Sequence, residues 1–102
     1  DAQPNDFYLA QNYPNPFVTG SQTSIVYQVA QMDSPHQMSI QVYNILGQRV
    51  STLFDGPLHG GIYKAVWDGK DMAGRTVPSG VYFYRLQSAE KTYERKLVIL
   101  EK

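Results

Sequence analysis

One stretch of alternating residues constrains the fold of this chain more than any other. Residues 60–86 read GGIYKAVWDGKDMAGRTVPSGVYFYRL, in which two runs with a period of two flank a polar segment. A strand buries one face at this period, and the glycines and aspartates of the polar segment 68–75 are typical of turns. We therefore predict a hairpin-like unit at the centre of the core, with large buried side chains at Trp67, Tyr82, Tyr84 and Leu86.

The rest of the chain repeats this alternation in short runs. Residues 7–9 predict a short first strand, and longer runs alternate over residues 23–29, 38–43, 50–54 and 92–100. Residues 32–37 are predicted to form a loop. Asp55-Gly56-Pro57 is predicted to end the strand at residues 50–54. About seven short strands with turns every 8–12 residues are typical of an antiparallel β-sandwich, an all-β fold. Its core would also include Ile25, Tyr27, Ile40 and Val42.

Segments near the two ends of the chain are expected at the margins of this sandwich. Pro14 and Pro16 cannot donate to a hydrogen-bond ladder, so their segment belongs at a sheet edge or at a crossing between sheets. Phe17 is then free to anchor into the core. The final run has a charged first half, which suggests an edge, and an apolar second half, which suggests burial on both faces. Residues 1–6 look like the tail of a linker, which leaves residues 7–102 as one domain.

Composition and charge exclude several classes of function. The 102 residues contain nine basic and nine acidic side chains, without a basic block, so no nucleic acid partner is expected. The longest apolar run, residues 97–100, is far too short to span a bilayer. Without cysteine there is no disulfide and no thiolate for catalysis or metal binding. Because the sequence starts at Asp1 rather than Met, we expect it to be cut from a longer protein.

Residues capable of chemistry are sparse. Asp68 and Asp71 could hold Ca²⁺, but their spacing does not match an EF-hand and Lys70 lies between them, so we favour a plain turn. His36 and His59 lie in different predicted loops, and solvated histidines are favoured over a metal pair. The serines lack a G-x-S-x-G elbow. The sequence does not exclude a pair of catalytic carboxylates like that of a glycosidase. Such a pair needs a cleft, and a sandwich of this length has few residues left to form one. We expect no catalysis, cofactor or metal.

The aromatic residues allow two interpretations. Tyr43, Phe83 and Tyr93 are expected on solvent-side faces, where a flat aromatic row could bind sugars. The favoured alternative is cross-strand packing, because strands are rich in tyrosine on both faces. Tyr82 also fits a tyrosine corner, in which the hydroxyl bonds to upstream backbone.

Four segments occur in an order that resembles a known family. They are NYPNPF at residues 12–17, VYNILGQRV at 42–50, WDGKDMAGRTVPSGVYFYRL at 67–86 and KLVILEK at 96–102. The set resembles the type A C-terminal sorting domain of proteins exported by the type IX secretion system. It is also similar to the Ig-like domain of the flagellar hook-capping protein, in which a W-D-G-x-D turn precedes a P-x-G-x-Y strand. The resemblance covers about residues 8–102.

This resemblance implies a seven-stranded Ig-like sandwich that acts as a non-catalytic targeting domain. The P-x-G-x-Y element of the sorting family corresponds to Pro78, Gly80 and Tyr82, and the basic residue before the final apolar strand corresponds to Lys96, followed by Leu97 and Val98. These six are the predicted recognition residues. A physical argument also supports a recognition role for the last strand, because an edge strand offers unpaired backbone groups to a partner.

The same resemblance implies partners and a location. The partners would be N-terminal cargo domains, the outer-membrane secretion machinery and a surface, sortase-like peptidase that usually removes the domain and joins the cargo to lipopolysaccharide. The protein would be secreted or held at the cell surface of a Gram-negative bacterium. The alternatives are an Ig-like structural or interaction module, such as a hook-capping-like spacer, and an accessory sugar-binding domain of a secreted hydrolase.

Overall fold

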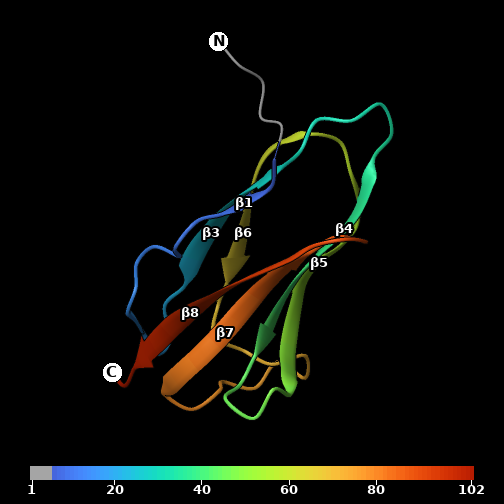
Figure 1. The fold of residues 1–102 in the computed structure, drawn as a ribbon. Helices are drawn as coiled ribbons and strands as arrows, with labels where there is room; N and C mark the ends of the chain where they lie inside the picture. The colour runs from blue at the N-terminus through green and yellow to red at the C-terminus, as the bar shows by residue number, and fades with distance from the viewer. Residues whose placement is uncertain (1–5) are drawn as a thin grey trace.

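Two β-sheets face each other in a computed structural model that describes residues 6–102 (Figure 1). The three-stranded sheet has the order β1-β3-β6, and the five-stranded sheet has the order β2-β8-β7-β4-β5. The eight strands are β1 (Tyr8–Leu9), β2 (Phe17–Val18), β3 (Thr23–Val29), β4 (His36–Tyr43), β5 (Arg49–Leu58), β6 (Gly61–Trp67), β7 (Gly80–Gln87) and β8 (Thr92–Leu100). The predicted all-β sandwich is confirmed. The predicted linker lies outside the described residues, except for Asp6.

The core lies between the inner faces of the two sheets. Trp67 is 1% exposed, and its ring packs edge-to-face against Phe17 and Tyr82, with ring centroids 5.8 and 5.7 Å apart. Each large apolar side chain buried in this way contributes roughly 1.5–3 kcal/mol. The predicted core residues are all buried: Ile25, Tyr27, Ile40, Val42, Trp67, Tyr82, Tyr84 and Leu86.

Residues 60–86 do not form the predicted hairpin. β6 pairs with β3, whereas β7 pairs with β4 and β8 in the other sheet. The segment between them, residues 68–79, crosses from one sheet to the other at one end of the sandwich (Figure 1). Alternation shows which face of a strand is buried, and both strands bury a face in one shared core without pairing.

Two strands are longer than predicted. β5 continues through Asp55, Gly56 and Pro57 to Leu58, because it is the end strand of its sheet, where proline is tolerated. His36 opens β4 instead of lying in a loop, and it pairs opposite Leu58.

The Pro-rich segment crosses between the sheets, as predicted, and Phe17 is buried. The Tyr13–Pro14 and Asn15–Pro16 peptide bonds are both cis. β2 then pairs parallel with β8, with Phe17 opposite Ile99, whereas the other strand pairs are antiparallel, as predicted.

The prediction that the apolar second half of β8 is buried on both faces was wrong. Leu97 and Ile99 point into the core, but Leu100 is 48% exposed. The outer face of the five-stranded sheet is turned to solvent, so in the apolar half of β8 only every second residue is buried.

Candidate recognition surface

The six predicted recognition residues come together where β7 begins and β8 approaches its end. The antiparallel ladder sets Gly80 opposite Ile99, Tyr82 opposite Leu97 and Phe83 opposite Lys96. Two elements that are separate in the sequence therefore lie side by side in one sheet.

Burial divides these six residues into two groups. Tyr82 and Leu97 are 6% and 0% exposed, so their side chains hold the two strands to the core. The other four are exposed or half-buried and can be reached from solvent: Pro78, Gly80, Lys96 and Val98.

The P-x-G-x-Y element forms the turn that leads into β7. The Tyr82 hydroxyl donates a hydrogen bond to the Pro78 carbonyl oxygen at 2.7 Å, the kind of upstream backbone bond expected of a tyrosine corner. Burial raises the pKa of Tyr82, which keeps this donor protonated. Gly80 has a φ of 142°, a conformation that favours glycine, although an added Cβ would meet nothing within 4 Å. Glycine is therefore required here for backbone conformation and not for space.

The edge of β8 beside Lys96 is covered by the Pro-rich segment. Gln11 Nε2 donates to the Lys96 carbonyl oxygen at 2.8 Å, and the Val98 N–H donates to Asn15 Oδ1 at 3.0 Å. Closer to the start of the strand, Arg95 Nε donates to the Leu9 carbonyl oxygen at 2.6 Å. A partner that adds a strand along this edge must therefore displace Gln11 and Asn15.

A buried polar cluster, which we call the Asn12 clamp (Asn12, Thr23 and Tyr84), fastens the Pro-rich segment. Asn12 Nδ2 donates to Thr23 Oγ1 at 2.9 Å and to the Pro14 carbonyl oxygen at 3.2 Å. The Tyr84 hydroxyl accepts the Asn12 N–H at 2.8 Å and donates to the Ala10 carbonyl oxygen at 2.6 Å. Burial raises the pKa of Tyr84 to about 12. Sequence reasoning missed this cluster, since an asparagine near prolines is typical of an ordinary turn.

The aspartates of the loop after β6 bind the backbone of their own loop. Asp68 Oδ1 accepts the Lys70 N–H at 3.1 Å, and Asp71 Oδ1 accepts the N–H groups of Arg75 and Ala73 at 3.0 and 2.9 Å. The pKa of Asp71 is below its usual range, mainly because the carboxylate accepts the Arg75 N–H. The Ala73 N–H and the charge of Arg75 lower it further. Within residues 6–102, no group of three or more His, Asp or Glu side chains could hold a metal ion.

We expect calcium and chelators to leave the thermal unfolding temperature of this domain unchanged. The carboxylates of Asp68 and Asp71 already accept backbone hydrogen bonds, and within the described residues they belong to no group of three or more His, Asp or Glu side chains that could hold a metal ion. Calorimetric scans with excess CaCl₂ and with EDTA measure this. A rise in the unfolding temperature with calcium that Asp71→Asn abolishes would contradict the expectation, because ligands of the native state stabilise it.

Residues 15–92 match the FlgD Ig-like domain family. The chain belongs to this family. Domains of this family are non-catalytic structural modules. A search of the curated proteins gives no match.

Solved structures share the fold of this FlgD Ig-like domain. Dimeric latent PorU from Porphyromonas gingivalis has a TM-score of 0.70 and 16% identity, and the match covers 95% of this chain and 10% of PorU. FlgD from P. aeruginosa has a TM-score of 0.62 and 21% identity, covering 96% of this chain and 74% of that one. PorZ is described as an essential surface component of the type IX secretion system of P. gingivalis. Its structure has a TM-score of 0.52 and 17% identity, and the match covers 92% of this chain and 11% of PorZ. The chain thus spans about a tenth of PorU and PorZ.

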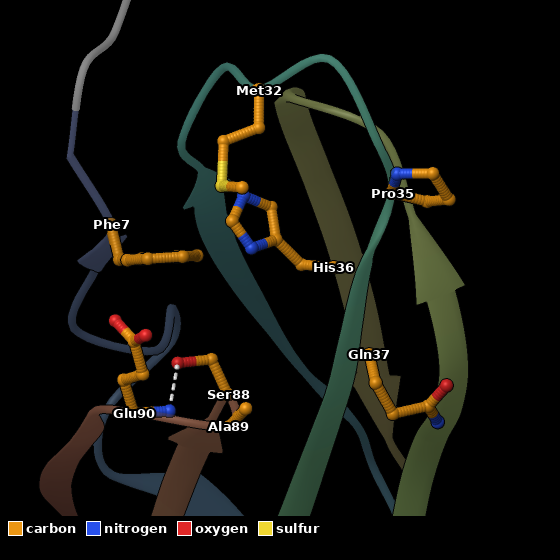
Figure 2. Close-up of a pocket in the computed structure, with 8 residues that line it drawn as sticks. All are labelled: Phe7, Met32, Pro35, His36, Gln37, Ser88, Ala89 and Glu90. Carbon is orange, nitrogen blue, oxygen red and sulfur yellow. Dashed lines mark hydrogen bonds between the residues drawn. The ribbon is translucent and has the colours of Figure 1, made fainter.

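A pocket of about 240 Å³ opens beside the start of β4 and the turn that follows β7 in the FlgD Ig-like domain (Figure 2). Phe7 lies with its ring centroid 5.0 Å from that of His36, and His36 Nε2 lies 3.1 Å from the Ala30 carbonyl oxygen. Glu90 is the one carboxylate in the pocket lining, so a glycosidase-like carboxylate pair does not occur there. No helix in the described part of the chain has the length and hydrophobicity needed to cross a membrane.

The aromatic residues divide between the two faces of the five-stranded sheet. Tyr43 and Phe83 lie opposite each other on the outer face, as predicted, and both are half-buried. Tyr93 lies opposite Leu86, packs against the core and has its ring centroid 6.4 Å from that of Phe7. The prediction was therefore wrong for Tyr93, which shares the inward direction of Leu97 and Ile99.

Proposed function

We propose that this FlgD Ig-like domain is the targeting domain of a larger exported protein and directs it through the type IX secretion system to the cell surface or medium. The observation that carries this proposal is the pairing of β7 with β8, which joins the P-x-G-x-Y and K-L-V elements in one surface. Its likeness in fold to PorZ, named as a component of that system, gives further support.

The proposed contact surface consists of the four accessible recognition residues: Pro78, Gly80, Lys96 and Val98. Lys96 supplies a charge beside a half-buried apolar residue, which can orient a partner on the sheet. Tyr82 and Leu97 act indirectly, since they fix the strands that carry these residues. The secretion machinery and a surface peptidase are the proposed partners, and the cargo is the rest of the same polypeptide.

A reporter fusion tests the proposal. Residues 1–102 are joined to the C-terminus of a periplasmic reporter in a strain with a working type IX system. We expect the reporter at the surface or in the medium, and we expect a fusion lacking Arg95 to Lys102 to stay in the periplasm. A full-length fusion that folds normally and stays in the periplasm would overturn the targeting proposal.

Lys96→Ala separates recognition from folding, because the deletion removes part of the core. An exposed substitution should change stability by no more than about 0.5 kcal/mol. We expect this variant to be retained, while Lys64→Ala on the exposed face of β6 is exported normally. Equal export of both variants would remove Lys96 from the contact surface.

A structural or assembly role is the second candidate, and the family match favours it. The match in fold covers 96% of this chain and 74% of P. aeruginosa FlgD. If the domain is only a spacer, replacing it in the intact protein by the Ig-like domain of that FlgD should leave localisation unchanged. Loss of localisation on this replacement would count against the spacer role.

A further inference from the structure

Aromatic and basic side chains form one row across the outer face of the five-stranded sheet. The register sets Arg49 opposite Tyr43, Tyr43 opposite Phe83, and Phe83 opposite Lys96. This set, which we call the aromatic row, therefore crosses β5, β4, β7 and β8 with a cation at each end. Because neighbouring strands lie about 4.8 Å apart, the two end positions are separated by roughly 14 Å.

Arg85 adds a third cation beside the aromatic row. Its guanidinium carbon lies 4.2 Å from the centroid of the Tyr43 ring, and its Nε donates to Glu94 Oε1 at 2.6 Å. These contacts fix the planar group before any ligand arrives, and the side chain is still 36% exposed. A preorganised guanidinium loses less conformational entropy when it binds a carboxylate or phosphate.

The charge of this face favours an anionic ligand. Arg49, Arg85 and Lys96 supply three positive charges to this face, and Glu94 and Asp55 supply two negative charges, which leaves an excess of one positive charge. Asp55 lies opposite Ser39, in the next row beyond Arg85, so the two rows that hold the three cations contain one carboxylate. The chain as a whole has a net charge of zero, so the excess is local.

The shape of the face favours a polymer with rigid rings. Small ligands bury most of their surface in clefts, whereas the aromatic row lies on the open face of a sheet. Phe83 and the stacked pair of Arg85 and Tyr43 offer flat surfaces on which a sugar ring can pack. An acidic peptide could supply the carboxylates but not the rigid rings. We propose that this face binds an acidic polysaccharide, with sugar rings on the aromatic row and acid groups on Arg49, Arg85 and Lys96. This activity goes beyond the targeting function proposed above.

Electrophoresis through gels that contain polysaccharide, followed by titration calorimetry, tests this site. We expect polygalacturonate to retard the domain and neutral dextran not to do so. Raising NaCl from about 20 to about 200 mM should weaken the binding, because exposed charges are screened. Arg49→Gln with Lys96→Gln should raise the dissociation constant about tenfold. Phe83→Ser should weaken binding, whereas Phe83→Tyr, which keeps the ring, should bind as tightly as the unsubstituted domain.

The matched control removes two cations from elsewhere on the surface. Lys64→Gln with Arg75→Gln causes the same change in net charge and should leave the dissociation constant unchanged. Circular dichroism verifies that every variant is folded. Arg49→Gln alone changes none of the six recognition residues, so its effect on sugar binding is separate from export. The proposal is overturned if polygalacturonate causes no retardation, if both double variants bind equally, or if polyglutamate binds as tightly as the polysaccharide.

Discussion

Trp67→Ala is expected to lower the free energy of unfolding by about 3–5 kcal/mol. The side chain is 1% exposed, and its ring packs against Phe17 and Tyr82 between the two sheets. Its Nε1 also donates to the Lys70 carbonyl oxygen at 2.9 Å, so the substitution frees the loop after β6. A domain of this size has a total stability of roughly 5–15 kcal/mol, so the variant should be close to unfolding.

Urea denaturation followed by far-UV circular dichroism measures this loss. Tyr13→Ala removes an aromatic side chain that is 81% exposed and serves as the control. If Trp67→Ala does not fold at all, Trp67→Phe keeps a ring in the core and should show a smaller but measurable loss. A loss below about 1 kcal/mol for Trp67→Ala, as is usual at surfaces, would show that the tryptophan is peripheral.

Tyr84→Phe should cost about 1–3 kcal/mol although it removes a single oxygen atom. In the Asn12 clamp this hydroxyl both accepts the buried Asn12 N–H and donates to the Ala10 carbonyl oxygen. The phenylalanine ring fills nearly the same space, so the cost comes from backbone groups left without a partner. Tyr13→Phe, at an exposed position, is the matched control and should cost almost nothing.

The same substitution should change the response of the domain to alkaline pH. Burial raises the pKa of Tyr84 to about 12, whereas an unfolded tyrosine ionises near pH 10. As the pH rises, the Tyr84 hydroxyl therefore loses its proton in the unfolded state before it does so in the folded state. The contribution of this hydroxyl to the free energy of unfolding is complete below about pH 10 and is lost as the pH rises towards 12. Burial also raises the pKa values of Tyr27 and Tyr82. The free energy of unfolding of Tyr84→Phe should consequently fall less steeply above pH 10, but still fall. An unchanged slope would contradict the role given to the Tyr84 hydroxyl.

The sequence predicted the faces of strands better than their partners. A period of two identifies the buried side of β6 and β7, so Trp67, Tyr84 and Leu86 were correctly placed in the core. It carries no information on pairing, and the crossing segment between these strands read equally well as a hairpin turn. Strand ends were missed for a related reason: Pro57 normally ends a strand, but it is tolerated in β5 because β5 has no neighbour on its other side in the sheet.

The candidate surfaces were predictable only in part. The six recognition residues came from a resemblance, but the buried state of Tyr82 and Leu97 followed from alternation alone. The Asn12 clamp depends on a bond between residues 12 and 84, and no local pattern specifies a contact over that separation. The aromatic row depends likewise on the register of four strands, which the sequence leaves open.

The parallel pair of β2 and β8 has a consequence for the order in which the domain can assemble. Phe17 lies beside Ile99, and the Gln11 side chain donates to the Lys96 carbonyl oxygen, so residues near the start of the domain have partners in its last strand. Synthesis proceeds from the N-terminus, and β2 cannot be paired until β8 has left the ribosome. The sandwich therefore cannot close before β8 is available, and its long-range contacts place folding in the slow range of milliseconds to seconds. β2 precedes most strands in the chain, yet it is among the last to be fixed in place, whereas β1 can pair with β3 much earlier.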